Sequence, residues 1–148
     1  MKNSHRIAGL LEEAADLIRQ ESEKGEDPKP RRFKKLSDGW VQDKELGLDW
    51  GPSSSARMVF AAANKYASKD GGRLPTSKEL MSLIDHARND PAIDTDFFID
   101  TNTDDWYWTG TTVAGNSDVA WCVNFSYGSV NGLHKDYDNY VRPVRPSQ

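Results

Sequence analysis

Residues 106–111 read WYWTGT, residues 119–125 read VAWCVNF and residues 140–145 read YVRPVR, and these three runs decide the fold. Each run contains β-branched and aromatic residues, and the segments between them are rich in Gly, Asn, Ser and Asp. Short runs of this kind separated by turn formers are typical of antiparallel strands. The stretch from Trp106 to Arg145 therefore predicts a small antiparallel sheet.

The composition is that of one globular domain with an acidic balance. The chain has 148 residues, of which 36% are hydrophobic and 10% aromatic, and this is enough for one core. The net charge of −4 disfavours nucleic acid and anionic membranes as partners. A single cysteine, Cys122, excludes an intrachain disulfide and a multi-thiolate metal site.

The sequence predicts neither a membrane span nor a secretory signal. No run approaches the roughly 20 apolar residues that a transmembrane helix needs. After Met1 and Lys2 the chain becomes amphipathic and acidic rather than continuously apolar. We therefore expect synthesis in the cytoplasm, so that an outward-facing role would require virion assembly, a fusion partner or specialised export.

Residues 1–24 are predicted to form an amphipathic helix. Its apolar side chains follow the helical spacing and are Ile7, Leu10, Leu11, Ala14, Leu17 and Ile18. A short helix is marginal in water by itself, so this stripe must dock on the chain's own domain or pair with copies of itself. Self-pairing predicts a homo-oligomer, and a trimer would strengthen weak binding through multivalency.

Residues 25–35 are predicted to form a linker that ends in a basic run. Five of the seven residues from Lys29 to Lys35 are basic. A binding patch for nucleic acid or another polyanion is one interpretation, and a solvated hinge is the other. The acidic remainder of the chain favours the hinge.

Residues 36–146 are predicted to form an α+β domain. Residues 38–50 suggest a hairpin, and residues 56–68 fit a helix. A second helix is expected to begin at a capping box made by Thr76 and Glu79 and to end before Pro91. The side chains expected to face inward are Val59, Ala62, Ala63 and Tyr66 on the first helix, and Leu80, Leu83 and Ile84 on the second.

An acidic loop follows the second predicted helix. Residues 94–105 contain five aspartates and no basic residue. Loops rich in oxygen ligands can hold calcium, but the spacing differs from the helix–loop–helix calcium pattern. A solvated acidic loop is the favoured interpretation, and a calcium site is the alternative.

No catalytic motif is present. The chain lacks a Gly-rich phosphate loop, a zinc-binding HExxH helix and a GxSxG nucleophile elbow. Cys122 and His134 are the only conceivable nucleophile and base, and their positions in the sequence do not bring them together. The sequence therefore predicts a protein that is not an enzyme.

The segment from residue 124 to residue 139 is better suited to binding. It is rich in Tyr, Ser, Asn and Gly, which supply aromatic contact area and adaptable hydrogen bonds at recognition surfaces. Solvated hairpin turns are the alternative interpretation. The candidate ligand-binding residues are Asn124, Ser126, Tyr127, Ser129, Asn131, His134, Asp136, Tyr137 and Asn139.

Six motifs in a fixed order carry a resemblance to a known family. They lie at residues 38–50, 73–80 (RLPTSKEL), 91–95 (PAIDT), 106–112, 121–130 and 140–145. In this order they resemble the bacterial and phage family named for the carboxy-terminal domain of the Lcl collagen-like adhesin. The resemblance covers about residues 36–145 and leaves out the N-terminal helix.

The resemblance implies a C-type-lectin-like fold, with two helices on a small, mostly antiparallel sheet. The same fold serves formylglycine-generating enzymes, which need active-site cysteines that a chain with only Cys122 cannot supply. It also serves the variable proteins of diversity-generating retroelements, whose variable positions correspond here to residues 124–139. The calcium-dependent sugar motifs of animal lectins are absent, so glycan binding without metal stays open.

These observations predict a non-enzymatic recognition domain that holds a protein or glycan ligand on its C-terminal strands and turns. The family favours a virion or surface adhesin, with or without retroelement diversification. The alternative is a structural phage decoration, tail or assembly component without its own ligand site. A third interpretation is a polyanion-binding module that uses residues 29–35.

Overall fold

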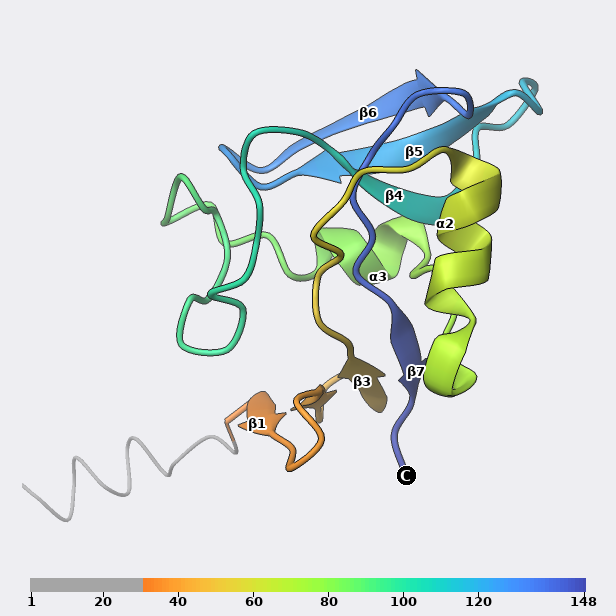
Figure 1. Cartoon of the computed structure of the whole chain (residues 1–148). Helices are drawn as coiled ribbons and strands as arrows, with labels where there is room; N and C mark the ends of the chain where they lie inside the picture. The colour runs from red at the N-terminus through yellow and green to blue at the C-terminus, as the bar shows by residue number, and fades with distance from the viewer. Residues whose placement is uncertain (1–30) are drawn as a thin grey trace, which may run out of the picture. The chain divides into compact units, whose positions relative to one another are not determined.

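Two antiparallel sheets and two short α-helices make up residues 31–148, the part of the chain that the computed structural model describes (Figure 1). One sheet has the strand order β1-β2-β3-β7, and the other has the order β4-β5-β6. The α+β class is therefore confirmed, although the strands form two sheets rather than the single sheet expected. The predicted helix 1–24 and linker residues 25–30 lie outside the described residues.

The elements have the following bounds. The strands are β1 (Phe33–Lys35), β2 (Val41–Asp43), β3 (Leu48–Trp50), β4 (Tyr107–Thr112), β5 (Val119–Asn124), β6 (Ser129–His134) and β7 (Val144–Pro146). The helices are α2 (Phe60–Ala67), the 3₁₀ turn η1 (Lys69–Gly71) and α3 (Ser77–Met81). Among residues 31–148, no helix has both the length and the apolar character that crossing a membrane requires.

The hairpin predicted at residues 38–50 is confirmed as β2 and β3. Asp43 closes its turn, because its carboxylate accepts the Glu45 and Leu46 N–H groups and its carbonyl accepts the N–H of Gly47. Gly47 has a φ of 67°, a left-handed conformation that glycine adopts without strain. The Asp43 carboxylate also accepts the indole N–H of Trp50 at 2.9 Å, so the turn is anchored to the core.

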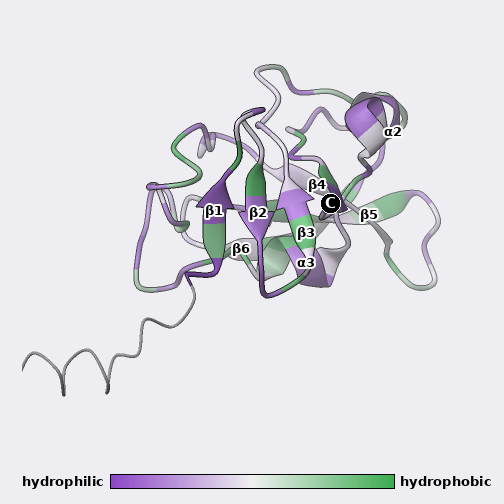
Figure 2. Ribbon diagram, turned by 90° about the horizontal axis from the view of Figure 1, so that it is seen from below, coloured by the Kyte–Doolittle hydropathy of each residue, from purple (hydrophilic) through white to green (hydrophobic). Residues whose placement is uncertain are grey.

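Two strands of the first sheet come from segments that were not predicted to join it. Residues 33–35, predicted to end the linker, form β1, because Phe33 packs edge-on against Phe98 and tilted against Phe97. Residues 144–146 leave the β4–β6 region and pair with β3 as β7. Figure 2 shows β1, β2 and β3 side by side, with hydrophobic and hydrophilic residues on each strand.

Both predicted helices exist, but both are shorter than expected. α2 buries Ala63 and Ala67, whereas Val59 and Ala62, expected to face inward, are exposed. α3 ends at Met81 instead of continuing toward Pro91. The chain turns away there because the Asp85 N–H donates to the Ala92 carbonyl instead of continuing the helical pattern.

The capping box predicted for the second helix is confirmed. The Thr76 hydroxyl accepts the Glu79 N–H at 3.1 Å, and the Glu79 carboxylate accepts the Thr76 N–H at 2.8 Å. Arg73 donates two hydrogen bonds to the same carboxylate. This guanidinium, acting against the cost of burial and together with the Thr76 N–H, holds the pKa of Glu79 below its ordinary value.

We expect Thr76→Ala to lower the free energy of unfolding by about 1 kcal/mol, because the cap of a five-residue helix is lost. Urea denaturation followed by tryptophan fluorescence measures this change. Lys78→Ala, at an exposed position of α3, is the matched control and should leave the midpoint nearly unchanged. Equal midpoints for wild type and Thr76→Ala would show that the cap contributes nothing.

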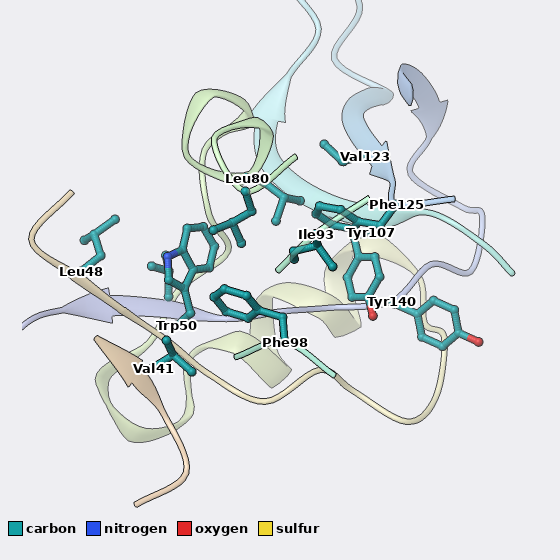
Figure 3. Close-up of a cluster of buried hydrophobic side chains, with 12 residues drawn as sticks. Val41, Leu48, Trp50, Leu80, Ile93, Phe98, Tyr107, Val123, Phe125 and Tyr140 are labelled. Atoms are coloured by element: carbon teal, nitrogen blue, oxygen red, sulfur yellow. The ribbon is translucent and has the colours of Figure 1, made fainter. Parts of the chain in front are cut away.

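Two clusters of buried side chains hold the domain together. The larger lies between the two sheets and α3, and Figure 3 shows Trp50, Leu80 and Phe98 gathered within it. The smaller packs α2 against one face of β4 and β5 and contains Ala63, Trp108 and Cys122. The β4–β6 sheet is thus covered on both faces near β4 and β5, which leaves its β6 side exposed.

Candidate functional site

The pairing of β5 with β6 fixes which face each candidate residue occupies. Directly opposite residues share a face, and neighbours along a strand alternate between faces. Asn131 lies opposite the buried Cys122, and Ser129 lies opposite Asn124, so these four share one face. His134 lies opposite Val119 and belongs to the other face.

Four of the candidate residues gather at the β5–β6 turn. The Asn124 side chain accepts the Ser126 N–H at 2.8 Å and thereby closes the turn. The Ser126 carbonyl accepts the Asp90 N–H, and this bond ties the turn to the loop between α3 and β4. Tyr127 at the tip is 70% exposed, and Ser129 is exposed where β6 begins. Asn124 and Ser126 therefore build the turn, and Tyr127 is what the turn presents.

A second group lies beyond the other end of β6. The His134 Nδ1 accepts the Asp136 N–H at 3.2 Å, and its ring lies 6.4 Å from the ring of Tyr137. Tyr137 is 57% exposed. Asp136 is also exposed, so this turn presents an aromatic ring beside a carboxylate.

Asn139 was predicted to bind a ligand, but it is buried. Its side chain is only 1% exposed and donates to the Cys122 Sγ at 3.8 Å. Its backbone exchanges two hydrogen bonds of 2.9 Å with Met58. These contacts make Asn139 a structural residue, because they hold the final turn against the chain before α2.

The candidate residues therefore do not form one cluster. Six residues of β6 separate the Tyr127 turn from the Asp136–Tyr137 turn, and a strand of that length spans about 17–20 Å. Asn131 lies between them, exposed, and its own Oδ1 accepts the Gly132 N–H. A single ligand of small size contacts one group or the other.

A pocket lies at the second group. It has a volume of about 530 Å³ and is open to solvent. Its lining residues come from three separate parts of the chain and are Arg57, Asp105, Trp106, Leu133, Asp136, Tyr137, Asp138 and Asn139. Trp106, Leu133 and Tyr137 supply apolar and aromatic wall, while the charged residues supply its polar side.

The side chains that line the pocket carry more negative than positive charge. Its single arginine, Arg57, donates to the Asp105 carboxylate, and this bond raises the pKa of Arg57 above its ordinary value. Asp136 and Asp138 add two exposed carboxylates. Three carboxylates facing one paired arginine favour ligands that offer hydroxyl or ammonium donors.

Buried contacts hold the pocket walls in place. The Trp108 indole N–H donates to the Met58 carbonyl at 2.8 Å, which fixes the chain next to Arg57. The Tyr140 N–H donates to the Trp106 carbonyl at 2.8 Å, and its hydroxyl donates to both oxygens of Asp104. Partial burial and this carboxylate raise the pKa of Tyr140 above its ordinary value. The pocket walls are therefore tied to β4 and to the residues just before it.

Sequence reasoning missed five lining residues as members of the site, namely Arg57, Asp105, Trp106, Leu133 and Asp138. Arg57 and Asp105 meet across 48 residues of sequence, and no periodic pattern marks such a pair. Trp106 belongs to a run that the sequence predicted only as a strand, but its side chain is half-buried and lines the pocket. Asp138 could have been included from the sequence, because it lies between two candidate residues of the same turn.

Cys122 and His134 do not meet. Cys122 is fully buried on the face it shares with Asn131, and His134 is exposed on the opposite face. Burial, with a smaller contribution from Asp105, raises the pKa of the Cys122 thiol to about 12. A thiol in this setting stays protonated near neutral pH and is a poor nucleophile.

The aspartates of the acidic loop 94–105 turn toward different partners. Asp100 bonds to Arg142, Asp104 bonds to Tyr140, and Asp105 bonds to Arg57. Within residues 31–148, no three His, Cys, Asp or Glu side chains converge in a way that could hold a metal ion.

Comparison with known proteins identifies the family. The model of the Lcl C-terminal domain matches residues 39–145, which include all strands from β2 to β6, the first two residues of β7 and every lining residue of the pocket. No curated protein matches the chain. Because the match spans most of the sequence, the chain belongs to the Lcl C-terminal domain family.

Proposed function

We propose that this domain is a non-enzymatic recognition module that binds its ligand in the pocket beside Tyr137. The observation that carries the proposal is the combination of an aromatic wall with exposed carboxylates in one open pocket of about 530 Å³. Binding pockets join apolar walls to a few placed polar groups in this way. Membership of the Lcl C-terminal domain family is consistent with a ligand-binding, adhesin-like domain.

The chemistry of the pocket narrows the ligand. Trp106 and Tyr137 offer flat surfaces for a sugar ring or an alkyl chain, and Asp136 and Asp138 accept hydrogen bonds from hydroxyl or ammonium groups. A polyanion is disfavoured there, because its charge would meet the three carboxylates. The ligand is therefore a protein segment with basic side chains or a neutral glycan, and its recognition needs no cofactor.

Catalysis is not part of the proposal. The separation of Cys122 from His134 removes the one nucleophile–base pair that the sequence allowed. We also propose that the domain has a C-type-lectin-like fold and acts on a virion or cell surface, as the family resemblance implies. In that setting several copies would act together, so modest affinity at each pocket would suffice.

The experiment is a screen of the full chain against an array of neutral glycans and basic peptides. Tyr137→Ala is expected to weaken the binding of any hit by about ten-fold, since exposed aromatic anchors commonly contribute more than 1 kcal/mol at interfaces. Asp136→Asn with Asp138→Asn should weaken the hit further if it carries ammonium groups. Titration by isothermal calorimetry measures both changes.

The matched control is Ile99→Ala, which removes a side chain that is 79% exposed and lies outside the pocket. It should leave affinity unchanged. A hit that binds wild type and Tyr137→Ala equally would place recognition elsewhere. Binding that is lost instead with Arg31→Ala and Arg32→Ala, and that weakens steeply with salt, would support the basic segment as a polyanion site.

A further inference from the structure

A second pocket lies at the first sheet and shares no lining residue with the pocket beside Tyr137. Its walls come from the β1–β2 hairpin, the segment after β3, the loop before β4 and the segment before β7. Its volume is about 310 Å³, which is at the lower end of the range for small-molecule sites. Since one water-sized group occupies about 30 Å³, the pocket has room for roughly ten non-hydrogen atoms.

Apolar side chains make up most of the wall of this second pocket. Trp40 and Phe97 contribute aromatic rings, and Pro52 and Ile99 contribute aliphatic surface. Ile99 is 79% exposed, the highest value among the exposed large hydrophobic side chains of residues 31–148. A ligand that covers this side chain removes apolar surface from water, and that burial is favourable. The wall therefore favours a ligand with an apolar body.

Contacts on either side of Trp40 hold this wall in place. The Leu36 N–H donates to the Trp40 carbonyl at 2.8 Å, which closes the turn between β1 and β2. The Arg145 guanidinium lies over the Trp40 ring, 4.0 Å from its centre. The Gly51 N–H donates to the Pro143 carbonyl at 2.8 Å and fixes the opposite wall. The pocket is therefore formed before a ligand arrives, so little ordering is needed on binding.

Arg142 contributes a buried donor to the lining. Its Nη1 donates to the Gly51 carbonyl at 3.0 Å. Its Nη2 donates to Asp100 at 2.8 Å and to Thr101 at 2.9 Å. The Arg142 Nε is also buried, but among residues 31–148 no acceptor lies within hydrogen-bonding distance of it. A buried charged donor without an acceptor is costly, so a ligand acceptor at Nε would be stabilised.

The lining of this pocket carries more positive than negative charge, the reverse of the pocket beside Tyr137. Lys35 is exposed, and its Nζ lies 6.0 Å from the centre of the Phe97 ring. Among the lining residues Asp100 supplies the one carboxylate. One of its oxygens accepts from Arg142, and the other accepts the Ser53 N–H at 2.8 Å. The charge of the lining therefore favours a ligand that is an anion.

We propose that this second pocket binds a small carboxylate that carries an apolar body. One carboxylate oxygen accepts the Arg142 Nε–H, which it reaches through the pocket, and Lys35 supplies a second positive charge. The body packs against Phe97 and Ile99. Hydrogen bonds between charged partners are shorter and stronger than neutral ones, so a carboxylate is preferred to an amide or a hydroxyl as the acceptor. The volume limits the body to about the size of one aromatic ring.

The first test is an NMR titration of the full chain with 3-phenylpropionate. We expect a dissociation constant on the order of 1 mM, the range for a ligand of this size. The Arg142 Nε–H resonance, assigned through bonds from its own backbone, should move downfield. The neutral 3-phenylpropionamide and acetate, which lacks the body, should each bind about ten-fold more weakly. Acetate binding as tightly as 3-phenylpropionate, or an unmoved Nε–H resonance near saturation, would overturn the proposal.

The second test uses variants that keep Arg142, because replacing it would remove a buried ion pair. Lys35→Gln should weaken 3-phenylpropionate binding about three-fold, as expected for one exposed charge. Ile99→Ala should weaken it about five-fold through lost apolar contact, and Tyr137→Ala, in the other pocket, should leave it unchanged. Equal affinity of wild type, Lys35→Gln and Ile99→Ala would overturn the proposal. Because the two pockets share no residue, that failure would leave the proposed function intact.

Discussion

Asp100→Ala is expected to destabilise the domain by about 3 kcal/mol, although this carboxylate is 43% exposed. Its partner Arg142 is only 2% exposed, and its guanidinium donates to Asp100, Thr101 and the Gly51 carbonyl. Removing Asp100 leaves a buried cation without its counter-charge, and that is the costly half of a buried ion pair. Urea denaturation measures the loss.

A double-mutant cycle separates the charge effect from packing. Arg142→Met combined with Asp100→Ala should recover part of the stability lost in Asp100→Ala, because the cation is removed as well. Asp96→Ala, at an exposed position of the same loop, is the control and should cost less than about 0.5 kcal/mol. If Asp100→Ala itself cost less than about 0.5 kcal/mol, solvent rather than Asp100 would be what compensates the charge of Arg142.

The same ion pair predicts a pH dependence. Burial alone would raise the pKa of Asp100, but the charge and hydrogen bond of Arg142, with the Ser53 N–H, hold it below its ordinary value. A carboxylate with a lowered folded pKa stabilises the protein fully above its unfolded pKa of about 3.9. That stabilisation is lost as the pH falls through the folded value. The difference between wild type and Asp100→Ala should therefore shrink below about pH 4.

Trp108→Ala is expected to lower the free energy of unfolding by about 4 kcal/mol. The indole is fully buried, packs edge-on against Phe60 at 5.4 Å and donates to the Met58 carbonyl. Alanine leaves a cavity in the smaller core and removes one of the two hydrogen bonds that the Met58 carbonyl accepts. Chemical denaturation should show a lower midpoint with an unchanged slope.

Trp108→Phe separates the hydrogen bond from the packing. It keeps an aromatic ring and loses the indole N–H, so we expect a smaller cost of about 2 kcal/mol. Because Met58 pairs with Asn139, amide hydrogen exchange at Asn139 should also become faster. Trp106→Phe, at a half-buried position, should cost less than either change. Equal losses in Trp106→Phe and Trp108→Ala would contradict the assignment of Trp108 to the core.

Local signals predicted the local structure. The hairpin at residues 38–50 and the capping box at Thr76 depend on residues only a few positions apart, so they can be recognised in the sequence. The end of α3 could not, because it depends on the Asp85 N–H finding the Ala92 carbonyl instead of a helical partner. The family resemblance predicted two helices with a small, mostly antiparallel sheet, but not the division of the strands into two sheets.

The candidate site was predicted in part for the same reason. Tyrosines in a segment rich in turn-forming residues can be recognised from the sequence, and Tyr127 and Tyr137 are indeed exposed. The burial of Asn139 follows from its pairing with Met58, which is 81 positions earlier in the chain (139 minus 58). Alternation along β6 does separate the faces, but only the register with β5 shows which residues point outward.

The pairing of β3 with β7 has a consequence for how the protein is made. Asp49 and Arg145 are neighbours in this pairing and are 96 residues apart in the chain. At the usual pace of translation, roughly 5–20 s pass between the synthesis of the two strands. During that interval the edge of β3 has no partner and is a template for any other extended chain nearby. Folding of the first sheet is therefore completed only after residue 146 has left the ribosome, and a crowded polysome is where misassembly would begin.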